Sequence, residues 1–178
     1  MNDVRKLRFL NKVLIFIIAV LLILSGILYY INREENGKSV RRNSYMATVL
    51  VKYAVEKAYY IHERYNETHN FTTLREDKQE IITLLNFSIS VLKDARKRCE
   101  SLGWPHLGLD NNIAAYQQLR DFLFINWGNS SKVIPVTSYI KDHFDVGIAL
   151  GFNIHEAECC FNYNYDSSNI IEEGLKRA

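Results

Sequence analysis

The chain has 178 residues, of which 48% are hydrophobic, and its 22 Lys or Arg against 20 Asp or Glu give a formal net charge of +2. The positive excess lies in the first 42 residues, and the remainder is slightly acidic. Because binding to a phosphate backbone requires a basic surface, we expect no nucleic-acid partner. The eight glycines are scattered singly, so the sequence also lacks the glycine-rich loops that bind nucleotide phosphates.

A long apolar stretch follows a basic N-terminal segment, residues 1–12. It runs from Val13 to Ile31 without a charge, and as a helix it reaches roughly 28 Å, about the thickness of the hydrocarbon core of a bilayer. The apolar part of a cleaved signal peptide is shorter, about 7–15 residues, and ends at small residues. Here Ile27–Ile31 continue the apolar character beyond Ser25-Gly26. We therefore predict a retained transmembrane helix that contacts the lipid bilayer.

Positive side chains flank the predicted span in equal number on its two sides. The free amino terminus adds a charge on the near side, so the positive-inside rule favours a cytoplasmic N-terminus and an extracytoplasmic C-terminal domain. We expect residues 32–42 to form a juxtamembrane linker in which Asn36-Gly37-Lys38-Ser39 breaks the helix. The soluble domain then comprises residues 43–178, a length that suits one domain with a single core.

Apolar residues at three-to-four spacing predict two helices at the start of this domain. The first covers about 42–66, and its five tyrosines are expected in the core and at its rim: Tyr45, Tyr53, Tyr59, Tyr60 and Tyr65. Thr73-Leu74-Arg75-Glu76 fits a capping box that begins the second helix, and Gly103 is its expected left-handed stop. The basic residues near the end of the second helix are expected to stay solvated: Lys93, Arg96, Lys97 and Arg98.

Two further helices are predicted after a loop. One runs from Asp110 or Asn111 to about Trp127, and because its segment 122–125 is apolar on all sides, we expect it to be the most buried helix. Its core-facing positions are Ile113, Tyr116, Leu119, Leu123 and Trp127. The other helix runs from Thr137 to Gly151.

The C-terminal part of the sequence has shorter patterns. A fifth helix is expected at 153–161, and one or two helical turns at 170–175. Segments 133–136 and 161–165 have extended patterns, and we expect them to form a minor two-stranded pairing. The predicted fold is therefore mainly α, with one N-terminal transmembrane helix and a compact domain of four to five helices.

The sharpest candidate for chemistry is the segment His155-Glu156-Ala157-Glu158-Cys159. Four residues apart on a helix, His155 and Cys159 share a face, as two zinc ligands must, and Glu156 lies where a general base would. The segment resembles the H-E-x-x-H motif of metalloproteases, but Cys replaces the second His and no later His completes the ligand set. His143 could join only through the tertiary fold, so we favour an ordinary helix face without a metal or other cofactor.

The three cysteines are Cys99, Cys159 and Cys160, too few for a disulfide scaffold. Outside the cytosol Cys99 can pair with one of the other two, and inside it all three would stay reduced. Cys159 or Cys160 beside His143 or His155 would be the arrangement of a cysteine nucleophile. Adjacent cysteines near aromatic residues favour packing instead.

Two other features are visible in the sequence. His62 and His69 are separated by one heptad, and we expect both on the surface. Four N-x-S/T acceptors are consistent with a secretory route in a eukaryotic or viral setting, although an Asn-rich chain also contains them by chance: Asn66, Asn70, Asn86 and Asn129.

The sequence favours a non-enzymatic role. A helical domain on a single anchor without a catalytic constellation typically acts through protein contacts, for which tyrosine and tryptophan are common anchors. We expect an accessory subunit or assembly factor of a membrane complex, with a protein partner. One alternative is an extracytoplasmic ligand-binding or sensing domain with a pocket between helices. Another is an anchored metal-dependent hydrolase that uses His155, Glu156 and Cys159.

Overall fold

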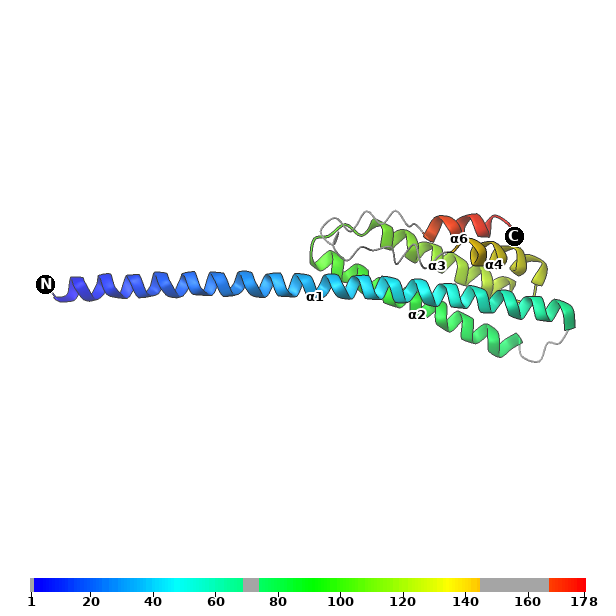
Figure 1. Ribbon diagram of the computed structural model, residues 1–178, viewed down its shortest axis with the longest axis horizontal. Coiled ribbons are helices and arrows are strands. Elements are labelled where there is room, and N and C mark those ends of the chain that lie inside the picture. The colour runs from blue at the N-terminus through cyan, green and yellow to red at the C-terminus, as the bar shows by residue number, and fades with distance from the viewer. Residues whose placement is uncertain (1, 69–73, 145–166) are drawn as a thin grey trace. The chain divides into compact units, whose positions relative to one another are not determined.

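A computed structural model of the protein describes residues 2–68, 74–144 and 167–178 (Figure 1). Within these ranges the chain forms helices and the loops between them, and no strand. The helices are α1 (Asn2–Thr68), α2 (Leu74–Ser101), α3 (Leu107–Asn126), α4 (Ser130–His143) and α6 (Ser167–Leu175). The predicted mainly α class is confirmed, as are the helical turns expected at 170–175.

The extended segment predicted at 133–136 is wrong, because these residues lie inside α4. Val133, Val136 and Ile140 are three to four residues apart and all buried. A helical period therefore accounts for the apolar residues that suggested a strand. The expected partner segment, 161–165, lies outside the described residues.

The bounds of α4 also differ from those expected. The helix begins at Ser130, well before Thr137, and ends at His143, where the backbone of Phe144 leaves the helical region. Its predicted end at Gly151 and the predicted helix at 153–161 fall outside the described part of the chain.

The expected break at 36–39 is wrong, since α1 continues through these residues. The side-chain amide of Asn36 donates to the backbone oxygen of Asn32 at 2.9 Å, and Lys38 Nζ lies 2.7 Å from a carboxylate oxygen of Glu34. Interactions between residues four apart each stabilise a helix by a few tenths of a kcal/mol. They offset part of the ~1 kcal/mol that Gly37 costs relative to alanine.

The chain divides into two units, Met1–Lys38 and Ser39–Ala178. In the first unit the large apolar side chains between Val13 and Ile31 are mostly exposed, from 41% at Val13 to 69% at Phe16. Among the described helices, α1 is the one with a stretch long and apolar enough to cross a membrane. Within the described residues, these side chains are thus exposed and do not belong to the hydrophobic core.

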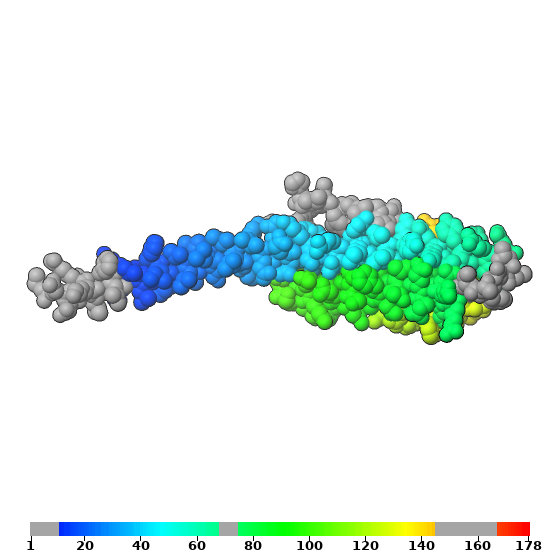
Figure 2. Space-filling view, turned by 90° about the horizontal axis from the view of Figure 1, so that it is seen from below, coloured from blue at the N-terminus to red at the C-terminus, as the bar shows by residue number. Residues whose placement is uncertain are grey.

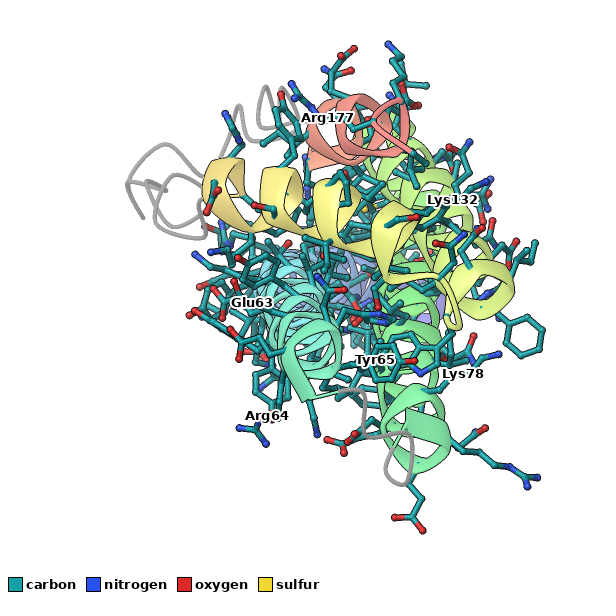
Figure 3. The ribbon with its side chains drawn as sticks, turned by 90° about the vertical axis from the view of Figure 1, so that its right-hand side faces the viewer. Glu63, Arg64, Tyr65, Lys78, Lys132 and Arg177 are labelled. Carbon is teal, nitrogen blue, oxygen red and sulfur yellow. The ribbon has the colours of Figure 1, made fainter. Side chains whose placement is uncertain are left out.

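The second unit has one hydrophobic core, around which α1, α2, α3 and α4 are arranged (Figure 3). From Val40 to Ala58, the core residues of α1 are small: Val40, Ala47, Val51, Ala54, Val55 and Ala58. The larger buried side chains come mainly from the other helices and include Ile81, Leu85, Leu92, Tyr116, Leu119, Leu123 and Ile140. The core volume is therefore filled chiefly by α2, α3 and α4.

Two predictions for α2 and α3 hold and one does not. Gly103, with φ 66°, follows the end of α2, and the predicted left-handed stop is confirmed. All five predicted core positions of α3 are buried: Ile113, Tyr116, Leu119, Leu123 and Trp127. The exposure of Phe124 and Ile125, 57% and 77%, counts against the expectation that the apolar segment 122–125 makes α3 the most buried helix.

The last helix, α6, packs on α3 and α4 (Figure 3). A Cβ added at Gly174 would lie 2.5 Å from Cγ1 and 2.9 Å from Cδ1 of Ile140. The glycine therefore allows α6 to approach α4 more closely than any other residue would.

Candidate functional site

His62 lies in the core and not on the surface, so the expectation for it is wrong. It continues the buried stripe of α1, four residues after Ala58 and seven after Val55. That spacing was a signal for burial, but the polar character of histidine argued against it. His69, expected on the surface as well, lies outside the described residues.

The ring of His62 contacts the segment that joins α3 to α4. Its Nδ1 lies 3.0 Å from Oγ of Ser130, the first residue of α4. The indole of Trp127 is edge-on to it, with ring centroids 4.6 Å apart and an angle of 81° between the planes. Within the described residues, Nε2 is buried without a hydrogen-bond partner. His62 thus connects α1 to the end of α3 through its ring and to the start of α4 through one nitrogen.

Burial lowers the pKa of His62 from 6.5 to about 4, because the charged imidazolium loses its hydration. The side chain is therefore neutral at neutral pH. In one tautomer Ser130 donates to Nδ1 and Nε2 carries the proton. In the other, Nδ1–H donates to Ser130 and the lone pair of Nε2 faces the core.

A second feature is the outer side of α1, which carries exposed large side chains. We call Tyr45, Met46, Tyr53 and Tyr60 the α1 tyrosine face; they are 41%, 37%, 50% and 58% exposed. Their spacing of seven or eight residues places them on one side of the helix. Figure 2 shows α1 beside α2 on the surface of this unit. Three of the five tyrosines expected in the core or at its rim are thus exposed.

The other two tyrosines of this helix are partly buried. The hydroxyl of Tyr59 donates to Glu63 at 2.7 Å, and Lys141 Nζ of α4 lies 4.4 Å from the centre of the Tyr59 ring. The hydrogen bond to Glu63 raises the pKa of Tyr59. Tyr65 packs against the core. These two residues match the expected position at the rim.

A charged cluster joins the end of α2 to the start of α3. Arg96 pairs with Glu100 at 2.7 Å and with Asp110, which also lies 2.7 Å from Nδ1 of His106. Partial burial would raise the pKa of Asp110, but the hydrogen bonds from His106 and Arg96 outweigh this and lower it. The expected solvated basic patch is thus partly neutralised, since Arg98 also pairs with Asp94.

Of the residues predicted to carry chemistry, His143 is the one that the structure describes. His143 is exposed at the end of α4, where it stacks on Tyr139 with ring centroids 4.1 Å apart. The other candidates lie outside the described residues: His155, Glu156, Cys159 and Cys160. In the part of the chain that is described, no group of three or more His, Cys, Asp or Glu could hold a metal ion.

Cys99 is a free thiol in the core, and burial raises its pKa. A thiol of this kind is protonated at neutral pH and unreactive. Its place on the buried face of α2 agrees with a packing role.

The acceptor asparagines differ in their settings. Asn86 lies in the middle of α2, and the hydroxyl of Ser88, which completes its motif, is buried and donates to the backbone oxygen of Leu84. Asn66 and Asn129 are exposed. Asn70 lies outside the described ranges.

Two features therefore stand out in the second unit, the buried His62 and the α1 tyrosine face. The chain shows no significant similarity to a known protein family model, a curated protein sequence or a solved structure.

Proposed function

We propose that the protein is anchored in a membrane by residues 13–31 and that residues 43–178 act through contacts with a protein partner, as an accessory subunit or assembly factor of a membrane complex. The α1 tyrosine face is the contact surface in this proposal. The observation that carries it is the exposure of Tyr45, Tyr53 and Tyr60 on one side of α1.

The exposed apolar side chains of the first unit support the anchor. Removing one large apolar side chain from water stabilises a protein by about 1.5–3 kcal/mol, and most of those between Val13 and Ile31 are exposed in the structure. A bilayer removes all of them from water at once. The proposed orientation has the N-terminus in the cytoplasm and the domain outside.

The composition of the tyrosine face supports a protein partner. Tyrosine combines a large apolar ring with a hydroxyl that can remain hydrated, and it is enriched among the residues that contribute most to protein interfaces. Exposed apolar side chains at seven-residue spacing lie on one side of a helix. A partner with an apolar groove or an apolar helix face can bind that side. The face is bordered by Lys52 and Glu56, which supply a polar rim. Nζ of Lys52 lies 3.9 Å from Oε1 of Glu56.

Site-specific photocrosslinking in native membranes tests the contact. We expect a photoreactive phenylalanine analogue at Tyr53 to yield a reproducible crosslinked partner. The matched control is the same analogue at Phe87, an aromatic residue of α2 that is 52% exposed, compared with 50% for Tyr53. Equal crosslinking from both positions, or none from Tyr53, contradicts the proposal.

A separate measurement tests the orientation. In intact cells, a protease added from outside is expected to remove a tag fused after Ala178, whereas a tag before Met1 remains protected until the cells are lysed. The reverse result places the domain in the cytoplasm. It overturns the proposed topology. The proposal of a protein partner is tested separately by the crosslinking experiment.

A further inference from the structure

His62 lies where α1, the end of α3 and the start of α4 meet. Its own side chain and that of Trp127 are buried, and Ser130 is half-buried. The connection between α3 and α4 is short, from Trp127 to Asn129. A movement of this turn away from α1 would therefore bring the ring of His62 into water.

The closed site supplies a hydrogen-bond acceptor for only one N–H group of the ring. An imidazolium has two N–H donors, and the site offers one acceptor, the hydroxyl oxygen of Ser130 at Nδ1. Within the described residues Nε2 has none. A buried donor without an acceptor costs about 1–3 kcal/mol, and more when it is charged.

Charged groups of the surrounding helices do not compensate. The titratable side chains on these helices at this end of the bundle include Tyr59, Glu63, Arg64, Tyr65 and Glu67 of α1, Arg75, Glu76, Asp77 and Lys78 of α2, Arg120 and Asp121 of α3, and Lys132 and Lys141 of α4. Figure 3 shows Glu63 and Arg64 on the outer side of α1, and Arg120 is paired with Asp121. Burial is the cause of the low pKa of His62, and none of these groups raises it.

We propose that protonation of His62 releases the turn between α3 and α4 from α1, so that this end of the bundle opens more often at mildly acidic pH than at neutral pH. The proton comes from water. In the open form both N–H groups of the imidazolium are hydrated. Deprotonation restores the bond to Ser130 and the ring contact with Trp127.

Hydrogen exchange of the full-length protein in detergent micelles tests the proposal. With a pKa of about 4 in the closed form and 6.5 in the open form, the opening constant rises about 30-fold between pH 7.5 and pH 5. We expect this rise, after correction for the intrinsic exchange rate, in the amides of residues 130–137. Amides in the middle of α2 provide the reference and are expected to change less.

Two variants at histidine positions separate the effect of His62 from other titrations. His62→Asn keeps a polar group near the position of Nδ1 and cannot be protonated, so its exchange at 130–137 is expected to be the same at both pH values. His143→Asn removes an exposed histidine of α4 itself and is expected to keep the 30-fold rise. A rise that persists in His62→Asn, or one of equal size in α2 and α4 of the wild type, overturns the proposal.

A second measurement does not depend on the folding of any variant. In the wild-type protein with labelled histidine, NMR follows the protonation of His62 directly. The proposal requires its midpoint to coincide with the midpoint of faster exchange at 130–137. Protonation of His62 without faster exchange overturns it.

Discussion

The imidazole of His62 stands edge-on to the indole of Trp127, with the two ring centroids 4.6 Å apart. An edge-to-face pair of aromatic rings contributes about 0.5–1.5 kcal/mol beyond the area that it buries. This pair joins α1 to the end of α3, and within the described residues no charged group contributes to the lowered pKa of the imidazole. The contact therefore belongs to the neutral form of His62, and the stability of the domain depends on pH.

We expect the free energy of unfolding to fall as the pH is lowered from about 6.5 to about 4. In this window the unfolded chain, with an ordinary histidine pKa, binds a proton at position 62 that the folded chain, with a pKa of about 4, does not. Protons then favour unfolding, by at most ~3 kcal/mol below the window and not at all above it. Denaturant titrations at pH 7.5, 6 and 5 measure this, and an equal dependence in His62→Asn would contradict it.

The close approach of α6 to α4 predicts a cost for Gly174→Ala. The new methyl group would meet Cγ1 of Ile140 at 2.5 Å, and overpacking of this kind costs about 1–3 kcal/mol. Alanine recovers up to about 1 kcal/mol through its helix propensity, so we expect a net loss of about 1 kcal/mol in the free energy of unfolding. Gly128→Ala is the control, because nothing lies within 4 Å of a Cβ there, and we expect a change below about 0.5 kcal/mol.

A buried hydrogen-bond chain between α3 and α6 predicts coupling between two substitutions. The hydroxyl of Tyr116 lies 3.2 Å from that of Ser167, which donates to Oδ1 of Asn112. In a double-mutant cycle of Tyr116→Phe and Ser167→Ala, we expect a coupling energy of about 1 kcal/mol. Thermal or chemical denaturation of the four proteins measures it. Additive effects within about 0.3 kcal/mol would show that the bond does not contribute.

The charged cluster at the end of α2 predicts a salt-sensitive stabilisation. Asp110→Asn removes the partner of both Arg96 and His106, and we expect a loss on the order of 1 kcal/mol or less, because the carboxylate is 37% exposed. The loss should shrink in 1 M salt. Since the pKa of Asp110 is lowered in the folded state, its contribution is present above the unfolded pKa and disappears as the pH falls through the folded one.

The matched control for this cluster is Asp121→Asn. Asp121 pairs with its neighbour Arg120 and is 59% exposed, so the substitution is expected to leave stability unchanged. If the two substitutions have the same effect, the cluster does not hold α2 to α3.

Helical spacing predicted the core of α3 from the sequence. Ile113, Leu119 and Leu123 recur on one side of the helix, and the structure buries them. The burial expected around Phe124 and Ile125 was not found. Neither periodicity nor composition shows how much of the surface of α3 the neighbouring helices cover. The helix stop at Gly103 was predicted correctly, because it depends only on the backbone conformation of that residue.

The features of the candidate site depend on tertiary contacts and were missed. His62 is buried because Ser130, 68 residues away, supplies a hydroxyl and Trp127 supplies an aromatic ring perpendicular to the imidazole. The helical spacing after Val55 and Ala58 indicates the buried side of α1, but no local pattern indicates the two partners of His62. The helical course of α1 through Asn36 and Gly37 was missed for a different reason, since bonds between residues four apart support the helix where the dipeptide alone favours a turn.

The small core residues of α1 have a consequence for synthesis. At about 5–20 residues per second, roughly 2–7 s separate the appearance of residue 68 from that of residue 101, where α2 ends, and during this time α1 has no complete partner helix from its own domain to cover it. Val40, Ala47, Val51, Ala54 and Ala58 offer little apolar area to another nascent chain in that interval. The first helix of the domain to be synthesised thus exposes mainly small apolar side chains on its inner face until the next helices appear.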